Sequence, residues 1–592
     1  MSEAEENHLH LIISGDLFLK DSQNLDAISC YTKAIQLKDI KTWDRVVLLP
    51  FYNNLAIAYK RQGDLQKAQR LYEEGLSIEP RYPLYYSNLF TIYKMQNRID
   101  AAEKLLLRAT MLERKDMGHF IALGELYKEK KEYKKSLNIA IECVKHFPNE
   151  YEAHLTLGNF FANMKLYAQA LDPYLAAIKI NPNSTRAYNN VGVVYKELGR
   201  YDESKEAYQK VLTINPNDPA VHNNLGNLLR YMDDTAGSIA HLEESIRLNP
   251  SYADAYSNLG AVYKESKAYE KAEIYYQKAL TLAPQHINAN FDLSLIELSR
   301  GNYSLGWKRY EYRLQMVELI SKLHHYTTPI WRGQPLREKV LILQNEQGFG
   351  DNIMFIRYVP TFIELGAKVI IRTRPELVEL FKSMPNVAMV CSEEDPIPEH
   401  DYYLPLLSAP YLFQTTQENI PQVFPYLSSS KPSPLIKKEG KPILKIGLVW
   451  SSSRTNKDFK NKYIGLEFYK KLFDIKGTKW YSLQAGGDAD EIKALNLGSK
   501  ITNLSEHLSD FSNTASIIES LDLVITTDTS VAHLCGAMNK EAWVLVPRPA
   551  DWRWMQEGET TPWYKSLKIF RQDKQGSWAA VITEIEKALK KC

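Results

Sequence analysis

Apolar and small residues recur along the first half of the chain with a period of 34 residues. In residues 185–214, one amphipathic segment (TRAYNNVGVVYKELGR) precedes a second (YDESKEAYQKVLTI), and Asn215 and Pro216 close the unit. Such a pattern predicts two helices packed as a pair and repeated along the chain. We expect about eight or nine units over residues 7–318, the first irregular with an insertion near residues 38–46.

Three classes of residue keep this period. The small Gly192 lets the paired helix approach closely, Tyr195 and Tyr208 fill the space between the helices, and Pro216 stops the second helix. A plain helical bundle is the alternative, but it has no reason to hold three residue classes on one interval. The recurring positions are Pro80, Pro148, Pro182, Pro216, Pro250 and Pro284, the glycines 124, 158, 192, 226 and 260, and the aromatic residues Tyr59, Tyr93, Tyr127, Phe161, Tyr195 and Tyr263.

One position of the unit carries asparagine in most repeats, and in helix-pair solenoids it faces the concave groove. An asparagine side chain has a donor and an acceptor, so a ladder of them can hold an extended polypeptide acceptor without reading its side chains. Solubility or local hydrogen bonding is the other interpretation, and both stay open. The residues are Asn54, Asn88, Asn190, Asn224 and Asn258, with Ala122 and Thr156 interrupting the series.

From about Glu338 the pattern changes to short apolar runs, each followed by a polar or glycine-rich turn and a helical segment. This alternation predicts parallel sheets covered by helices, an α/β arrangement. The predicted domains are a repeat superhelix at 1–318, a connector at 319–337, one α/β lobe at 338–430, a linker at 431–442 and a second lobe at 443–592. The apolar runs are 340–343, 369–371, 446–449, 480–483, 523–525 and 543–546.

A glycine-rich turn, residues 345–351 (NEQGFGD), follows the first apolar run. Gly348 and Gly350 allow a tight turn close to a ligand, and the turn delivers Asp351 to the carboxyl edge of the sheet, where ligands of such folds bind. Helix capping by Asp351 is the alternative.

Two further segments follow strands of the second lobe. Residues 524–534 (VITTDTSVAHL) run from a strand into a helix whose free N–H groups favour an anion such as a diphosphate, with Asp528 and His533 within reach. Residues 451–462 (SSSRTNKDFKNK) form a loop whose four cations can neutralise phosphates. Capping by Asp528, Thr529 and Ser530, a structural histidine and a solvated basic loop are the alternatives.

Composition narrows the function classes. Lys+Arg at 73 nearly cancels Asp+Glu at 71, which argues against a general nucleic-acid or membrane-surface binder. The 5 cysteines have no CxxC spacing, which suits neither a disulfide framework nor a zinc site and fits a reducing cytosol. The polar start (MSEAEENHLH) and the lack of a long apolar run predict a cytoplasmic protein without a membrane span.

Taken together, these segments resemble bacterial tetratricopeptide-fused glycosyltransferases. The catalytic half is similar to ADP-heptose heptosyltransferases, and the overall plan is similar to O-GlcNAc transferase, which has an asparagine ladder, and to flagellin glycosyltransferases. The resemblance covers nearly the whole chain. It rests on Gln347–Asp351, Trp450 with its basic loop, Tyr481–Gln484, Asp528–Leu534 and Asp551–Trp554.

The resemblance implies an inverting GT-B enzyme that needs no metal and no cofactor beyond its nucleotide-sugar substrate. It makes Asp351 the candidate general base, on the turn formed by Gln347, Gly348 and Gly350. The implied donor-binding residues are Lys457, Lys462, Gln484, Asp528, Thr529, Ser530 and His533. Asp551–Trp554 is a family signature without an assigned role, and its tryptophans are equally consistent with packing.

The chain departs from the family pattern in its basic loop. Arg454 and Gly465 stand where relatives tend to have proline, and Lys460 and Lys462 where they tend to have arginine. Lysine keeps the charge but loses the bidentate fork, so we expect weaker phosphate contacts there. Residues 488–490 (DAD) could be read as a metal-binding DxD motif, but we interpret them as a surface coincidence.

The sequence thus predicts a glycosyltransferase that moves a sugar from a nucleotide donor to a hydroxyl of a protein acceptor, held by the repeats. Flagellin is the leading acceptor on the resemblance alone. Two alternatives stay open: a repeat scaffold with an inactive GT-B remnant, and a heptosyltransferase-like enzyme acting on a glycan. Neither nucleic acid nor membrane insertion is expected.

Overall fold

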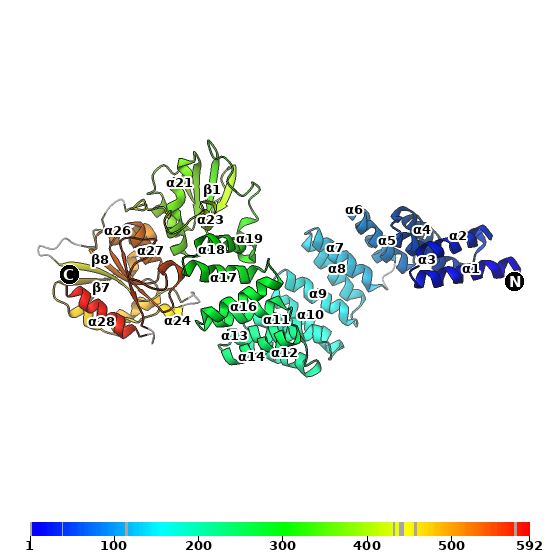
Figure 1. Ribbon diagram of the computed structural model, residues 1–592, viewed down its shortest axis with the longest axis horizontal. Helices are drawn as coiled ribbons and strands as arrows, with labels where there is room; N and C mark the ends of the chain where they lie inside the picture. The colour runs from blue at the N-terminus through cyan, green and yellow to red at the C-terminus, as the bar shows by residue number, and fades with distance from the viewer. Residues whose placement is uncertain are drawn as a thin grey trace. The chain divides into compact units, whose positions relative to one another are not determined.

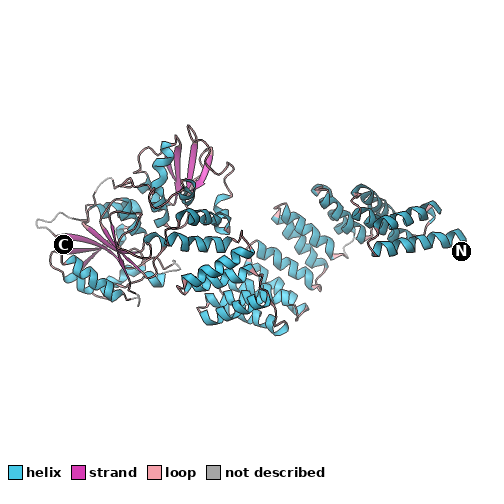
Figure 2. Cartoon of the chain, in the orientation of Figure 1, coloured by secondary structure: helices cyan, strands magenta, loops and turns pink. Residues whose placement is uncertain are grey.

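The computed structural model describes residues 3–37, 39–112, 116–429, 432–436, 443–454, 459–573 and 577–591. Packing divides the chain into two compact units, Met1–Pro250 and Ser251–Cys592. The first unit is all-helical, whereas the second combines helices with two sheets (Figures 1 and 2).

The first unit consists of antiparallel helix pairs, in the alternation that the 34-residue period predicts. The first pair is followed by a 3-10 turn at Ile40–Thr42, within the expected insertion. The helices are α1 Glu3–Lys20, α2 Asn24–Leu37, α3 Arg45–Arg61, α4 Leu65–Ile78, α5 Pro83–Met95, α6 Ile99–Leu112, α7 Met117–Glu129, α8 Tyr133–His146, α9 Tyr151–Asn163, α10 Tyr167–Ile180, α11 Thr185–Glu197, α12 Tyr201–Ile214, α13 Pro219–Tyr231 and α14 Thr235–Leu248.

Pairs that carry the recurring glycine pack closely at that residue. A Cβ atom added at Gly192 would lie 2.5 Å from a ring carbon of Tyr208, so only glycine lets α12 pack this tightly on α11. The hydroxyl of Ser204, on α12, donates to the Gly192 carbonyl at 2.6 Å. The same bond recurs one repeat later, from Ser238 to the Gly226 carbonyl at 2.6 Å. The contact between glycine and aromatic ring therefore has the role that the sequence predicts.

The second unit begins with further helix pairs and continues into α/β structure. Its first helices are α15 Ala253–Glu265, α16 Tyr269–Leu282, α17 Ile287–Ser299, α18 Tyr303–Tyr310 and α19 Val317–Leu323, with a 3-10 segment, η2, at Glu311–Gln315. The helices among the strands are α20 Phe349–Phe355, α21 Val359–Glu364, α22 Pro375–Phe381, α23 Ala409–Leu412, α24 Phe459–Lys462, α25 Glu491–Ala494, α26 Phe511–Glu519, α27 Ser530–Ala537 and α28 Trp578–Leu589.

Both sheets are entirely parallel. The first has the order β3-β2-β1-β4 and the second the order β10-β9-β8-β5-β6-β7. The strands are β1 Val340–Gln344, β2 Lys368–Thr373, β3 Met389–Ser392, β4 Tyr402–Pro405, β5 Leu444–Val449, β6 Thr478–Ser482, β7 Ile501–Asn503, β8 Leu523–Thr527, β9 Ala542–Val546 and β10 Leu567–Arg571. The α/β class is confirmed, and each sheet lies within one predicted lobe.

The last repeat helices share one hydrophobic core with the sheets. Trp307 of α18 is 1% exposed and makes edge contacts with Trp552 and Trp563 at ring distances of 5.5 and 6.2 Å. The same cluster includes Phe355 of α20, whose ring lies 6.0 Å from that of Trp307. The compact units therefore divide after Pro250, upstream of residue 318, where the sequence pattern of the repeats ends.

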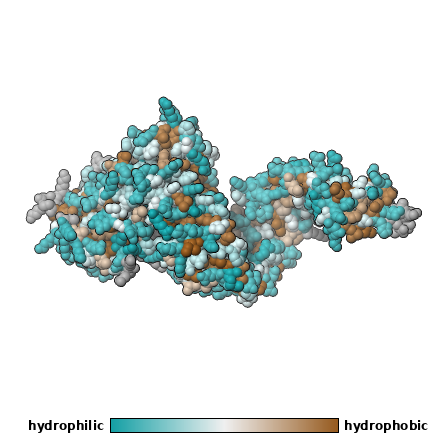
Figure 3. All heavy atoms as spheres, in the orientation of Figure 1, coloured by the Kyte–Doolittle hydropathy of each residue, from teal (hydrophilic) through white to brown (hydrophobic). Residues whose placement is uncertain are grey.

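Polar side chains dominate the face drawn in Figure 3, with apolar residues in scattered patches. None of the helices in the described part of the chain has the length and apolar character needed to cross a bilayer.

Candidate functional site

A cavity of about 1020 Å³ opens between the carboxyl ends of the two sheets. Counted within its own lobe, the second sheet has the strand order 3-2-1-4-5-6, and the first has 3-2-1-4. In such sheets the order reverses beside the first strand, and ligands bind at that switch point. The segments after β1, β5 and β8 all line the cavity, so both switch points open into it.

The glycine-rich turn forms the wall on the side of the first sheet. Gln347 has a φ of 48°, in the left-handed region, and begins the turn. The N–H of Gly348 donates to Asp351 Oδ2 at 3.0 Å, which caps α20 as the alternative reading of Asp351 predicts. A Cβ atom at Gly350 would lie 2.7 Å from His533 Cδ2, so glycine is required where the turn meets α27.

Asp351 is also ion-paired. Its Oδ1 accepts from Arg553, which donates at the same time to Asp551 Oδ1 at 2.8 Å. The Asp351 and Arg553 side chains are 15% and 12% exposed, respectively. Burial opposes the Arg553 charge, but the two carboxylates outweigh it and hold the pKa of Arg553 above its ordinary value. The structure thus brings Asp351 together with a residue of the 551–554 signature.

The start of α27 forms the opposite wall. Thr529 is the N-cap residue of this helix, and Ser530 is its first helical residue. Asp528 is 6% exposed and pairs with Lys462 Nζ at 2.7 Å. Burial by itself raises the pKa of Asp528, but Lys462 outweighs burial and the pKa lies below its ordinary value. A cation and the N–H groups of a helix start therefore lie in one cavity wall.

His533 lies on α27 and is 4% exposed. Its ring stacks on Trp554 at 5.1 Å, and its Nδ1 lies 2.9 Å from the Tyr564 hydroxyl. Burial, with a further contribution from Arg553, lowers the pKa of His533 to about 4. The imidazole is therefore neutral at neutral pH.

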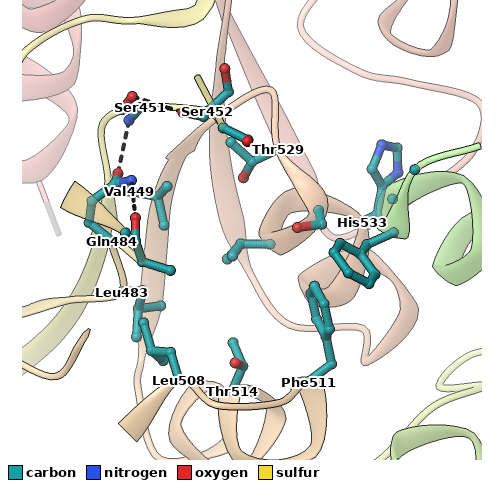
Figure 4. A pocket seen from close by; sticks show the side chains of 18 of the residues that line it. Val449, Ser451, Ser452, Leu483, Gln484, Leu508, Phe511, Thr514, Thr529 and His533 are labelled. Atoms are coloured by element: carbon teal, nitrogen blue, oxygen red, sulfur yellow. Dashed lines mark hydrogen bonds between the residues drawn. The ribbon is translucent and has the colours of Figure 1, made fainter. Parts of the chain in front are cut away.

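The loop after β5 is anchored by two buried side chains. Gln484 Oε1 accepts from the Trp450 N–H at 3.2 Å. It also accepts from the Ser451 N–H at 3.0 Å (Figure 4). Asp488 accepts from Ser451 Oγ at 2.5 Å and from Arg454 at 2.6 and 3.0 Å. Lys457 lies outside the described residues, so its predicted phosphate contact stays a prediction.

The interpretation of residues 488–490 as a surface coincidence is wrong for Asp488, which is 4% exposed. Its carboxylate holds the basic loop in place, because Ser451 and Arg454 both bind it. Within the described residues, no cluster of three or more His, Cys, Asp or Glu side chains is arranged to hold a metal ion.

The asparagine ladder lies on the first helices of the pairs and is half-buried. In the first unit its amides donate to the preceding repeat: Asn54 to Asp16 at 2.8 Å, Asn88 to Asn53, Asn190 to Asn159 and Asn224 to Asn189, each at 2.9 Å. Local hydrogen bonding, the second reading of these residues, is therefore present. Asn258 belongs to the second unit, on α15.

Sequence reasoning missed three residues of the site region. Arg553 was given no role, yet it pairs with Asp351; the neighbouring Trp552 and Trp554 are buried, as the packing interpretation allows. Tyr564 and Arg374 were not singled out, although one binds His533 and the other lines the cavity. Only the three-dimensional fold brings these residues to the site. Nothing in the local sequence pattern distinguishes them from other tyrosines or arginines.

Comparison with known proteins identifies the repeats. Models of the tetratricopeptide repeat match residues 60–123, 185–218 and 217–285. Among curated proteins, protein FlbA of Caulobacter vibrioides is 26% identical over 333 residues, which is 51% of this chain and 54% of FlbA. The chain therefore matches about half the length of this relative.

Several solved structures resemble the repeats. A tetratricopeptide repeat protein from Parabacteroides merdae is 23% identical, with 40% of this chain and 93% of that chain covered and a TM-score of 0.33. YrrB, a TPR protein with an unusual peptide-binding site, is 20% identical, with coverages of 32% and 98% and a TM-score of 0.27. Together with the helix pairs and their 34-residue period, the repeat models show that the N-terminal part of the chain carries tetratricopeptide repeats, and the C-terminal part has two parallel α/β sheets.

Proposed function

We propose that the C-terminal part is a GT-B glycosyltransferase, which transfers a sugar from a nucleotide donor to a hydroxyl of a protein acceptor bound by the repeats. The observation that carries the proposal is the convergence of both switch points on one cavity. A cleft between two doubly wound lobes can hold a nucleotide on one wall and an acceptor on the other.

The charges of the cavity support a phosphate-bearing donor. Lys462, Arg454, Arg553 and Arg374 line it together with the N-terminus of α27. Loss of a nucleoside diphosphate from a sugar leaves negative charge on the phosphate oxygens, and fixed cations and helix N–H groups stabilise such charge. Three of these cations already pair with carboxylates of the same cavity, so a phosphate would share Lys462 with Asp528, Arg454 with Asp488, and Arg553 with Asp351 and Asp551. The base and the sugar of the donor stay open.

Asp351 is the general base of the proposal. The acceptor oxygen attacks the anomeric carbon, the bond between that carbon and the phosphate oxygen breaks, and Asp351 takes the hydroxyl proton. Arg553 must first release Asp351 Oδ1, since it occupies that oxygen. Release costs less than the loss of a lone ion pair, because Asp551 stays bound to the guanidinium at 2.8 Å. In-line attack from the side opposite the phosphate inverts the anomeric centre.

The repeats supply the acceptor site of the proposal. The family resemblance makes flagellin the first acceptor to test. Each ladder asparagine of the first unit donates one amide N–H to the preceding repeat. An acceptor backbone would pair with the second N–H and the carbonyl oxygen of these side chains.

A scaffold without catalysis is the second candidate. Its support is that both Asp351 oxygens are engaged, one by Arg553 and one by the Gly348 N–H. A scaffold would keep this arrangement permanently, whereas an enzyme must open it when the acceptor arrives.

The test measures release of nucleotide from UDP-, ADP-, GDP- and CMP-linked sugars, with and without flagellin, for the wild type and Asp351→Asn. We expect turnover of one donor, its loss in Asp351→Asn, and unchanged donor affinity. Asp401→Asn is the matched control, because Asp401 pairs with Lys339 at 2.9 Å outside the cavity. Unchanged turnover in Asp351→Asn would remove Asp351 as the base, and absence of turnover and binding with every donor would favour the scaffold.

A further inference from the structure

A buried arginine without a carboxylate partner lies behind the site. Arg357 is 2% exposed, in a 3-10 turn, η3, at Ile356–Tyr358. It donates to the carbonyls of Met354 and Trp563, both at 2.8 Å, and to the Tyr426 hydroxyl at 3.1 Å. Within the described chain no carboxylate forms an ion pair with it, and its charge faces aromatic rings instead. The field of this cation is therefore not cancelled by a neighbouring anion.

Tyr564 lies between Arg357 and the site. Its ring centre is 4.7 Å from the Arg357 guanidinium carbon, and the ring packs on α27, where a Cβ atom at Gly536 would lie 2.2 Å from it. Burial raises the pKa of Tyr564 well above its ordinary value, so the phenol keeps its proton. Its hydroxyl lies 2.9 Å from His533 Nδ1.

The Arg357 charge decides which way the Tyr564 proton points. A hydroxyl hydrogen carries positive charge, so the guanidinium disfavours an orientation toward itself. The neighbouring Tyr426 accepts from Arg357 and donates its own proton to the Ile353 carbonyl at 3.1 Å. The Tyr426 hydroxyl also interacts with Tyr564, but Arg357 and the Ile353 carbonyl already engage it. His533 Nδ1, at 2.9 Å, is therefore the favoured acceptor of the Tyr564 proton. A neutral imidazole that accepts at Nδ1 carries its hydrogen at Nε2.

The cavity side of His533 favours the same tautomer. Asp528, Asp351 and Asp551 act on the ring from that side against the single guanidinium of Arg553. The three carboxylates favour an N–H over a lone pair at Nε2, whereas Arg553 opposes it. The edge formed by Cδ2 and Nε2 faces Gly350, at 2.7 and 3.3 Å from a Cβ atom built there.

We propose that His533 presents a neutral Nε2–H donor beside Gly350, and that Tyr564, backed by Arg357, is the positioning residue that fixes this tautomer. The proposal deepens the donor-binding function proposed above and rests on it. The Nε2–H donates to an oxygen of the nucleotide-sugar donor. In this tautomer the ring lone pair of His533 lies at Nδ1, where Tyr564 donates to it, so it cannot take the acceptor proton and Asp351 remains the base.

The tautomer itself can be measured without substrate. Full-length protein labelled with ¹⁵N only in histidine gives distinct nitrogen shifts for Nδ1–H, Nε2–H and imidazolium rings, and loss of one signal in His533→Gln assigns the residue. We expect a neutral Nε2–H ring at pH 7 in the wild type. A ring protonated at Nδ1, or at both nitrogens, would overturn the proposal. Since this measurement uses the wild type, a variant that fails to fold does not affect it.

The role of Tyr564 is tested by Tyr564→Phe, which keeps the ring on Gly536 and removes the hydroxyl. We expect a mixture of tautomers at His533 and a roughly tenfold weaker affinity for the donor identified by the panel of nucleotide sugars. Tyr469→Phe is the matched control: Tyr469 is equally buried, lies in the same lobe, and its hydroxyl has no hydrogen-bond partner. An unchanged His533 tautomer in Tyr564→Phe would remove Tyr564 as the positioning residue.

A second pair of variants tests the donor hydrogen independently. The Gln amide nitrogen falls near the Nε2 position of histidine, and the Asn amide nitrogen near Nδ1. We therefore expect His533→Gln to keep most donor affinity and His533→Asn to lose it roughly tenfold. The reverse order would overturn the proposal. If no nucleotide sugar binds the wild type at all, the proposed function fails, while the tautomer measurement still decides the assignment of Tyr564.

Discussion

The pair formed by Lys462 and Asp528 shows how strongly single residues of the site depend on one another. Asp528 is 6% exposed and Lys462 Nζ lies 2.7 Å from it, so the carboxylate is desolvated and compensated by one cation. Removing one member of such a pair leaves a buried charge, which is costly, whereas removing both is often nearly neutral.

We predict that Lys462→Met lowers the free energy of unfolding by about 3 kcal/mol, because Asp528 is left buried and charged. The double variant Lys462→Met with Asp528→Asn should recover most of the loss. Urea unfolding followed by tryptophan fluorescence measures this, because of the 10 tryptophans only Trp43 lies outside the second unit. Additive effects of the two substitutions would contradict the coupling.

His533 predicts a pH dependence of stability. Its pKa is about 4 in the folded state against an ordinary value of 6.5, so between these values the unfolded chain binds more protons and stability falls as the pH is lowered. From pH 7 to pH 4.5 the wild type should lose about 2–3 kcal/mol more than His533→Gln. Equal losses in urea titrations at both pH values would show that His533 is not held neutral by its surroundings.

The sequence predicted only those site residues that closely follow a predicted strand. Asp351, Asp528 and His533 follow apolar runs, and parallel strands bring their carboxyl ends to one edge. Arg553 and Tyr564 reach the site from the region after β9, where no run or period marks them. Asp488 was misread because a short polar segment looks exposed, while its anchoring partners, Ser451 and Arg454, lie more than thirty residues away.

At the scale of elements, the 34-residue period predicted the helix pairs and their close contacts well. The six apolar runs match β1, β2, β5, β6, β8 and β9, which are the internal strands of both sheets. The four strands that were missed, β3, β4, β7 and β10, are the sheet edges. Internal parallel strands are buried on both faces and read as apolar runs, whereas edge strands such as β7, with two exposed residues, lose that signal.

The packing of helix pairs predicts a cost for a single methyl group. In Gly192→Ala the new Cβ atom would lie 2.5 Å from the Tyr208 ring, so we expect a loss of about 1–2 kcal/mol, despite the higher helix propensity of alanine. Far-UV circular dichroism of thermal unfolding measures the loss.

Gly498→Ala is the control for this prediction. Nothing lies within 4 Å of its Cβ position, and its φ lies outside the left-handed region. We expect no loss there. Tyr208→Leu should relieve Gly192→Ala, and equal effects of alanine at both glycines would contradict the proposed packing.

At the scale of the whole molecule, the compact units predict which fragments fold. Residues 251–592 include Trp307, Tyr303 and Tyr310, which share a core with both sheets. A fragment of residues 319–592 lacks these side chains and exposes their partners Trp552 and Trp563. We expect residues 251–592 to unfold cooperatively and 319–592 to aggregate or melt at clearly lower temperature. Identical melting curves would show that the last repeats are not part of this core.

The central claim is that the cavity at the two switch points binds a nucleotide sugar. The most direct measurement is calorimetric titration of the full chain with ADP-, UDP-, GDP- and CMP-linked sugars, alongside Lys462→Met and Lys500→Met. Lys500 pairs with Asp474 on the surface at 2.5 Å and is the matched control for loss of one lysine. The account predicts binding of one donor class, weakened at least tenfold by Lys462→Met and unchanged by Lys500→Met. Absence of binding with all four, or equal affinity in both variants, would contradict it.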